Sequence, residues 1–273
     1  MTEDTTDLAR RMRIQALGMV HRAKASHIGS ALSIVDILAV LYGQVMRTDA
    51  ARPDWPERDR LLLSKGHACV AVYAALAERG FIDDDAVRSY GQDHSALMNH
   101  VSHKVPGVEF STGSLGHGLP FGVGKALAAK KRGLPWRTFV ILGDGELGEG
   151  SNWEAMMFAA HHRLDNLVGI VDYNKLQSLT TVEQTLRIEP LADKLRAFGW
   201  AVQEVDGHDH AALARALGRT PWAPGQPGML VAHTTKGKGV DFMENSVDWH
   251  YRSPSAQQLE QALEQLQREP AHA

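Results

Sequence analysis

Apolar positions recur at helical spacing near the start of the chain and later give way to short, continuous apolar runs. The first pattern predicts a helix over residues 5–24, with Thr5 or Thr6 as its N-cap. After a turn at residues 26–30, the apolar run at 34–41 predicts a second helix that Ser33 caps. The chain therefore begins with helices that have apolar faces to bury.

From residue 61 onward, apolar runs alternate with amphipathic segments. The runs predict strands at 61–63, 138–142, 167–172, 200–205 and 228–234. The intervening segments predict helices at 67–79, 119–132, 151–162, 191–198, 210–217 and 255–268. Nearly continuous apolar strands that alternate with helices are typical of a parallel sheet covered on both faces. We therefore expect an α/β fold in one domain (1–273), a doubly wound parallel sheet with helices on both faces, and a frayed tail at 269–273.

Composition narrows the class of protein. The 273 residues are 44% hydrophobic and 22% charged, and the formal net charge of −3 comes without a basic block. These values are typical of a globular protein and argue against a nucleic-acid binder. The single cysteine, Cys69, excludes an internal disulfide framework, and no apolar run approaches the ~20 residues of a membrane span. With a polar, acidic N-terminus, the sequence predicts a cytoplasmic protein without membrane partners.

The strongest local signal is the glycine-rich turn Gly143–Gly150, which contains a G-x-G-x-x-G pattern between a predicted strand and a helix. That pattern invites a dinucleotide-binding interpretation. However, Asp144, Glu146 and Glu149 place three carboxylates where a pyrophosphate would approach the backbone. The pattern also lies 142 residues into the chain rather than at the start of its domain. We therefore favour a site in which a cation bridges the carboxylates and a phosphate.

Asp144 and Asn174 support a metal site. Each residue follows the end of a predicted strand, and the two are 30 positions apart. Adjacent parallel strands bring such positions to one edge of the sheet, where open α/β proteins bind ligands. Mg²⁺ prefers oxygen ligands of this kind together with phosphate oxygens and water. The alternative is that Asp144 caps the next helix and Asn174 fills a turn.

These residues also carry a resemblance to a known family. Gly143-Asp144-Gly145, followed by Asn174, looks like the thiamine diphosphate signature, and five further segments narrow it to transketolase. They are Lys24–Gly29, Leu63–Ala68, Ser111–Gly118, Asp206–Asp209 and Thr234–Gly239. The match runs from about residue 10 to about 255. The chain is accordingly identified as similar to the N-terminal, diphosphate-binding part of transketolase.

The resemblance implies a set of site residues. Asp144, the Asn174 side chain and the Leu176 carbonyl would hold Mg²⁺, or Ca²⁺ or Mn²⁺ in its place. The residues implied to bind thiamine diphosphate are His67, Gly113, Ser114, Leu115, Gly145, Glu146, Asn174 and His250. The histidines implied to line the channel to the reacting carbon, and to move protons there, are His27, His67, His100 and His250. Histidine suits that role because its ordinary pKa lies near neutral pH.

The resemblance also implies a partner. In this family the cofactor lies between a diphosphate-binding domain and a pyrimidine-binding domain that supplies the activating glutamate. The chain matches the first of these, so it resembles the N-terminal subunit of a split transketolase. We expect an α2β2 heterotetramer with a C-terminal, pyrimidine-domain subunit. Sugars or sugar phosphates would be its substrates, and a two-carbon ketol group would pass from a ketose to an aldose.

Alternative functions remain open at this stage. The nearest enzyme alternative to a transketolase subunit is half of another thiamine diphosphate enzyme, such as a 2-oxoacid dehydrogenase α subunit or a deoxyxylulose-phosphate-synthase-like protein. A non-catalytic assembly partner is the alternative from another class. The identity of the ketose and aldose is not predicted.

Several remaining polar residues have structural interpretations. His161 and His162 lie at a predicted helix C-terminus, where a cation offsets the helix dipole. His208-Asp209-His210 predicts a turn and a helix cap in preference to a metal site. In place of the small residues usual in the family after the last channel histidine, this chain has Tyr251-Arg252-Ser253, and Arg252 is expected on the surface. No role is assigned to His103, His117 or Lys238.

Overall fold

Five parallel strands form one sheet at the centre of the fold, and the computed structural model describes residues 4–268. In spatial order the strands are β1 (Arg60–Leu63), β2 (Thr138–Gly143), β3 (Leu167–Tyr173), β5 (Gly228–His233) and β4 (Ala201–Asp206). Every neighbouring pair is parallel. The predicted parallel sheet is confirmed, and each strand begins and ends within one residue of its predicted bounds. The tail predicted to fray lies outside the described residues.

Both faces of the sheet are covered, because alternate residues of β1, β2, β3 and β5 enter different apolar clusters. The edge strand β4 is only partly buried. Phe139 and Ile141 of β2 belong to one cluster, whereas Val140 and Leu142 belong to the other. Side chains that alternate along a strand point to opposite faces. This is the physical reason that the strands appear in the sequence as continuous apolar runs.

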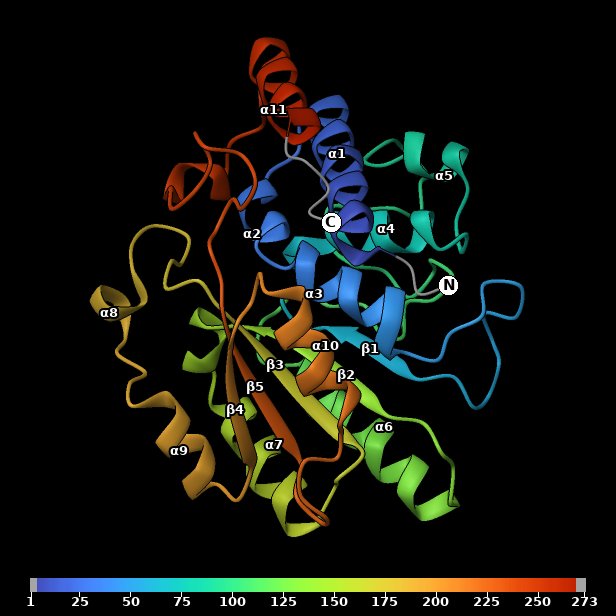
Figure 1. The fold of residues 1–273 in the computed structure, drawn as a ribbon, viewed down its shortest axis with the longest axis vertical. Helices are drawn as coiled ribbons and strands as arrows, with labels where there is room; N and C mark the ends of the chain where they lie inside the picture. Colours follow the sequence, from blue (N-terminus) through green and yellow to red (C-terminus); the bar gives the residue numbers. More distant parts are fainter. Residues whose placement is uncertain (1–3, 269–273) are drawn as a thin grey trace.

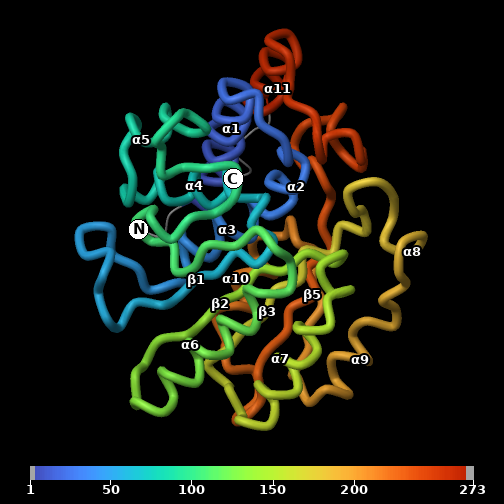
Figure 2. Tube along the Cα trace, turned by 180° about the vertical axis from the view of Figure 1, so that it is seen from behind, coloured from blue at the N-terminus to red at the C-terminus, as the bar shows by residue number. Residues whose placement is uncertain are grey.

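Helices cover the two faces as separate layers (Figure 1). One layer contains α1 (Thr5–Ala23), α2 (Ile28–Leu32), α3 (Val35–Val40), α4 (Cys69–Glu78) and α10 (His210–Gly218), with α11 (Ala256–Arg268) packed against α1. The other contains α6 (Gly118–Arg132), α7 (Gly150–His161) and α9 (Leu191–Ala197). Figure 2 shows the same division from behind. The predicted doubly wound architecture is confirmed.

The N-terminal helices differ from their prediction in two details. Asp4, and not Thr5 or Thr6, caps α1, because its carboxylate accepts the Thr6 and Asp7 backbone N–H groups. Ser33 does not cap a helix over 34–41. Its hydroxyl donates to the Ser30 carbonyl and is 2.7 Å from Asp172 Oδ2. Residues 34–41 instead contain α3, with Ile34 at its N-cap position, and the start of a π-helical turn, η1 (Leu41–Val45). The Ser33 side chain is thus bonded to a buried carboxylate and not to the start of α3.

The long stretch without periodicity, residues 91–118, contains only turns and bends as far as Gly118, where α6 begins. Two short helices had no clear sequence signal: α5 (Asp84–Arg88) and α8 (Val182–Thr185). The helix predicted from His67 begins as a 3₁₀ turn, η2 (Gly66–Ala68), and continues as α4. Within residues 4–268, no helix has the length and apolar character to cross a bilayer.

The carboxyl ends of four strands bring polar segments together. Lys65 follows β1, Asp144 follows β2, Asn174 follows β3 and Lys236 lies beyond β5. The short 3₁₀ turns η3 (Gly145–Gly148) and η4 (Val247–His250) lie at the same edge. Parallel pairing places all these ends on one side of the sheet, which is where an open α/β fold offers a crevice.

Candidate functional site

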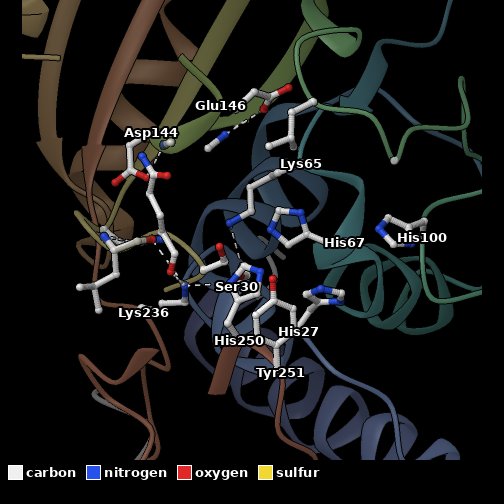
Figure 3. A pocket seen from close by; sticks show the side chains of 18 residues that line it. His27, Ser30, Lys65, His67, His100, Asp144, Glu146, Lys236, His250 and Tyr251 are labelled. Atoms are coloured by element: carbon white, nitrogen blue, oxygen red, sulfur yellow. Dashed lines mark hydrogen bonds between the residues drawn. The ribbon is translucent and has the colours of Figure 1, made fainter. Parts of the chain in front are cut away.

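A pocket of about 270 Å³ lies at the carboxyl edge of the sheet. Loops that follow β1, β2, β3 and β5 form one wall, while the α1–α2 turn, residues 100, 113 and 115, and η4 form the other. Figure 3 shows acidic and lysine side chains on one side and histidines on the other. The pocket therefore brings together residues from segments that are far apart in the chain.

The four predicted channel histidines meet in this pocket. The ring centroid of His27 is 5.2 Å from that of His67, 5.7 Å from that of His100 and 5.0 Å from that of His250. The rings of His67 and His250 are 5.4 Å apart. His100 thus lies with the other three.

These histidines are poor bases in the folded chain. Burial, followed by the charges of neighbouring histidine and lysine groups, lowers the pKa of His27 to about 4 and that of His250 to about 3. Burial also lowers the pKa of His67 well below its ordinary value, and lowers that of His100. Because removal from water disfavours the charged form, the cluster is neutral at pH 7.

The tautomer of His250 follows from its neighbour. Its Nδ1 lies 3.1 Å from the Lys236 Nζ, which can only donate. The proton of the neutral ring is therefore on Nε2. His250 is consequently available as a hydrogen-bond donor through that nitrogen.

The position of His27 requires an unusual backbone. Its φ is 71°, in the left-handed region, and it precedes α2. The His27 N–H donates to the His250 carbonyl at 2.8 Å, which joins the α1–α2 turn to η4. Left-handed non-glycine residues are uncommon and cluster at functional sites, where the surrounding structure holds them.

Asp144 is a buried carboxylate on the other side of the pocket. Its oxygens accept the Gly145 N–H at 2.7 Å and the Lys175 N–H at 2.5 Å, and its exposed fraction is 3%. Burial and the nearby Asp172 charge raise its pKa to about 7. Its side chain caps the 3₁₀ turn η3 and not the helix that the alternative interpretation named, because Glu149 is at the N-cap position of α7. In the part of the chain that the structure describes, no lysine or arginine forms an ion pair with it.

Asn174 and Leu176 lie beside Asp144 in the same pocket. The Asn174 amide donates to Asp172 Oδ2 at 3.0 Å, and its Oδ1 accepts the Leu176 N–H at 3.0 Å. Within residues 4–268, the Leu176 carbonyl receives only a long contact, 3.4 Å, from Lys236 Nζ. The three oxygen groups predicted to hold a metal thus converge.

The other predicted cofactor contacts divide into two sets. Gly113, Leu115 and Gly145 line the pocket, whereas Ser114 does not appear among its described lining residues. Glu146 also lines it, but its carboxylate accepts the Ser64 hydroxyl and the Gly116 and Gly143 N–H groups. Burial raises its pKa. Its oxygens thus hold neighbouring loops together.

Two lysines at the site were missed by the sequence interpretation. Lys65 donates to the Ser30 carbonyl at 3.1 Å and pairs with buried Asp172. Lys236 is 1% exposed, and its Nζ donates to the Gln177 carbonyl at 2.8 Å. Burial, together with the Lys65 charge, lowers the pKa of Lys236 to about 8. The signal was present, because both lie in quoted motifs just beyond strand ends.

The residues interpreted as structural lie elsewhere. Asp209 caps α10 by accepting the Ala212 N–H at 2.9 Å, and α7 ends at His161, as expected. Arg252 is 67% exposed and pairs with Asp248. Residues 4–268 contain no cluster of three or more His, Cys, Asp or Glu arranged to hold a metal.

The residues to which the sequence assigned no role also lie outside the lining of this pocket; they are His103, His117 and Lys238. The His103 ring contacts the Ser111 hydroxyl at 2.7 Å, and the His117 ring contacts the Leu115 carbonyl at 2.8 Å. Lys238 pairs with Glu244 at 3.5 Å. Tyr251, by contrast, lines the pocket and is 60% exposed.

Comparison with known proteins agrees with this geometry. The family model described as "Transketolase, thiamine diphosphate binding domain" matches residues 4–273. The chain is 40% identical to an apulose-4-phosphate transketolase subunit of Phocaeicola vulgatus, with 97% of this chain and 95% of that protein covered. It is 39% identical to a 6-deoxy-6-sulfo-D-fructose transketolase subunit of a Clostridium species, with 99% and 100% covered.

Solved structures give the same result. A transketolase from Leishmania mexicana superposes with a TM-score of 0.92 at 30% identity. The match covers 99% of this chain but 42% of the Leishmania chain, so this protein spans about two fifths of that transketolase. A Campylobacter jejuni transketolase gives the same TM-score and identity, with 98% and 43% covered. From its sequence, its fold and the convergence of these residues, the chain belongs to the transketolase family and comprises its thiamine diphosphate-binding domain.

Proposed function

We propose that residues 1–273 form one domain, the diphosphate-binding subunit of a split transketolase. The complete enzyme transfers a two-carbon ketol group from a ketose or its phosphate to an aldose or its phosphate. The observation that carries the proposal is the pocket at the sheet edge, where a buried carboxylate and two lysines lie beside four neutral histidines. The relatives named as transketolase subunits support it, because they match this chain over nearly their whole length.

The residues of the pocket fit a divalent cation and a diphosphate. Asp144 is a buried carboxylate with a raised pKa, and a cation beside it would offset the cost of its charge. Asn174 Oδ1 and the Leu176 carbonyl complete a set of hard oxygen ligands, which Mg²⁺, Ca²⁺ and Mn²⁺ accept. Lys236 and Lys65 supply positive charge for the phosphates. We propose that these three oxygen groups hold the metal.

Close contacts to thiamine diphosphate are assigned to small residues and to two histidines. Gly113 and Gly145 allow close approach of a ligand to the backbone. Ser114 and Leu115, in the same loop as Gly113, complete that side, with His67 and His250 facing the cofactor. Asn174 and Glu146 act from the diphosphate side, and Glu146 does so through the loops that it holds.

In this proposal, the histidines of this chain bind and orient the sugar substrate. Thiamine diphosphate, when bound, supplies the nucleophilic carbon that carries the two-carbon unit. His27, His67, His100 and His250 orient sugar hydroxyls and move protons at them. The His250 Nε2–H donates to a hydroxyl oxygen, and the neutral His27 ring can accept a hydrogen bond from a hydroxyl group. Neutral rings suit this work because they both donate and accept.

We further propose that the chain works in the cytoplasm as an α2β2 complex with a pyrimidine-domain subunit. Because the cofactor is shared between the two kinds of chain, neither is complete without the other. The substrates are sugars or sugar phosphates. The specialised sugars in the names of the two relatives are properties of those proteins.

Mixing the subunits tests the proposal. The purified chain alone should show no ketol transfer, and activity should appear when the pyrimidine-domain subunit, thiamine diphosphate and Mg²⁺ are added. The coupled assay would follow the aldose product. Robust turnover by the single chain would contradict the split-subunit proposal, and pyruvate turnover by the mixture would indicate another thiamine enzyme. A mixture containing Asp144→Ala should stay inactive and serves as the matched control.

A further inference from the structure

The segment that follows β5, residues 234–239, brings Lys236 into the pocket and is held along its backbone. The Thr234 N–H donates to the Tyr173 carbonyl at 3.2 Å, and the Gly237 N–H donates to the Gly29 carbonyl at 2.9 Å. Gly237 has a φ of 83°, and an added Cβ would lie 2.2 Å from the Met243 carbonyl oxygen. The segment therefore has little room to adopt another path.

Two side chains from distant elements hold this segment on either side of Lys236. The Thr235 N–H donates to His208 Nε2 at 2.8 Å, one residue before the lysine. Arg13 Nε, from α1, donates to the Lys238 carbonyl at 3.0 Å, two residues after it. Neither contact involves the pocket itself, so both act on Lys236 only through the backbone.

Both of these side chains also form hydrogen bonds with one carboxylate, that of Asp36 in α3. Arg13 forms two hydrogen bonds to it, at 2.9 and 2.6 Å, and His208 Nδ1 lies 2.6 Å from its Oδ2. We call Arg13, Asp36 and His208 the Asp36 clamp. The side chains of Arg13 and Asp36 are 7% and 6% exposed. A bidentate pair with so little exposure is a rigid anchor.

The contacts of His208 define its protonation. Nε2 accepts a backbone N–H, so it carries no proton, and Nδ1 must then be the donor to Asp36. Only the neutral ring with the proton on Nδ1 can make both bonds. A substituted side chain with only a hydrogen-bond donor would lose the bond from the Thr235 N–H, and one with only an acceptor would lose the bond to Asp36.

We propose that His208, fixed by Asp36, is a positioning residue that holds the 234–239 segment so that the Lys236 ammonium faces the cofactor diphosphate. The inference rests on the proposed function, because it takes the diphosphate to be the partner of Lys236. The Lys236 ammonium is then already in place when the diphosphate binds, so binding does not have to order it. Preorganised groups bind more tightly because less conformational freedom is lost on binding.

Two nearly isosteric variants separate the two bonds of His208. His208→Asn retains a donor at the Nδ1 position for Asp36 and removes the acceptor for the Thr235 N–H. His208→Gln places an amide oxygen at the Nε2 position and keeps that acceptor. In the assembled enzyme with Mg²⁺, we expect His208→Asn to weaken thiamine diphosphate binding about 3- to 10-fold, the effect of one hydrogen bond. His208→Gln should stay within about twofold of the wild type.

Amide hydrogen exchange gives a readout that does not depend on activity. In the full chain without cofactor, the 234–239 backbone should exchange faster in His208→Asn than in the wild type. The same segment should remain protected in His208→Gln. Equal exchange and equal affinity in the two variants would overturn the inference, because a purely structural histidine would not distinguish them.

A double-mutant cycle with Lys236→Met tests whether His208 acts through the lysine. The single variant Lys236→Met should weaken cofactor binding, and adding His208→Asn should then have little further effect. Full additivity would overturn the positioning role while leaving the proposed function intact. Unchanged affinity in Lys236→Met itself would instead overturn the placement of the diphosphate, and the inference with it.

Discussion

Two groups of histidines in this protein have the same chemistry but opposite surroundings. The pocket histidines, His27, His67, His100 and His250, lie against one another and near two lysines. His208 and the nearby His210 instead lie 2.6 and 3.0 Å from the oxygens of Asp36. Within the described residues, no pocket histidine has a hydrogen bond to a carboxylate. The difference lies in the partner and not in the residue type.

The hydrogen-bond partner of a histidine ring determines whether its nitrogens are available to a substrate. Asp36 holds His208 in one tautomer and one orientation, so that ring is occupied on both nitrogens. Burial alone would raise the pKa of Asp36, but the Arg13 charge and the bonds from both histidines hold it well below its ordinary value. The pocket rings stay neutral because burial disfavours their charged form, and among residues 4–268 no carboxylate forms a hydrogen bond that would support that form.

The sharpest test of this comparison removes pocket histidines. His27→Ala and His250→Ala should each reduce kcat/KM for ketol transfer by about 10²–10⁴, the usual contribution of a positioned acid–base group. For His27→Ala, affinity for thiamine diphosphate and assembly with the partner should change much less, whereas His250→Ala should also weaken cofactor binding, because His250 faces the cofactor. Steady-state kinetics of the assembled enzyme, with calorimetry for the cofactor, would measure both.

His210→Ala is the matched control for those variants. Its ring bridges Asp36 and the Thr5 hydroxyl, at the far end of the helical layer. We expect a loss of about 1–3 kcal/mol in stability, from unmade buried hydrogen bonds, and a rate within a few-fold of the wild type. A rate loss like that of His27→Ala, without a loss of stability, would break the division between the two groups.

Removing the carboxylate at the centre of the second group should mainly affect folding. Asp36→Ala leaves the Arg13 charge buried without its partner, which typically costs about 3–5 kcal/mol. Urea unfolding of the full chain would give the change in the free energy of unfolding. Asp36→Asn should cost less, because the amide oxygen still accepts from Arg13. A stability of Asp36→Ala equal to that of the wild type would show that the network contributes little.

Asp144 extends the comparison to a buried carboxylate that lacks a basic partner. Its pKa is about 7 in the folded chain and about 4 when unfolded. Between these values the folded state binds more protons. Its contribution to stability is therefore complete below pH 4 and is lost as pH rises through 7. At pH 8 without metal, Asp144→Asn should stabilise the chain by about 1–3 kcal/mol.

The same variant should lose Mg²⁺-dependent binding of thiamine diphosphate, because the charged ligand is gone. Thermal melts at pH 5 and pH 8, without and with Mg²⁺, would show the gain only at the higher pH and only in the metal-free protein. Asn174→Ala, which removes a neutral ligand, should weaken cofactor binding less. Unchanged cofactor affinity in Asp144→Asn would mean that the glycine-rich turn binds something else.

The smallest effect is expected at the end of α7. His162 follows the helix C-terminus and lies against Phe158, with ring centroids 4.2 Å apart. His162→Ala should lower stability by at most about 1 kcal/mol through the lost dipole interaction and leave the rate intact. Melting temperature and kcat would be compared with those of His27→Ala. A severe rate loss at unchanged stability would contradict the placement of the channel.

Much of the fold could be predicted because its signals are local. Strands buried on both faces need continuous apolar runs, and β1, β2, β3 and β5 have them. The partly exposed strand β4 includes Gln203 and Glu204, yet it too was predicted within a residue of each end. Short elements such as α8 bury few side chains and leave little pattern in the sequence. Ser33 was misassigned because a serine before an apolar run predicts a cap, whereas its bond is to Asp172, which is 139 residues away.

The sequence by itself determined the parallel sheet, the glycine-rich turn after β2 and the residue types that converge at the carboxyl edge. Spacing along the chain is enough for these, because parallel strands bring their ends together. Only the tertiary structure decided which polar side chains already have hydrogen-bond partners within the protein. Glu146 holds loops, Lys236 enters the pocket, and His208 faces Asp36 instead of a ligand. Hydrogen-bond partners and burial come from distant segments, and these set the protonation that chemistry requires.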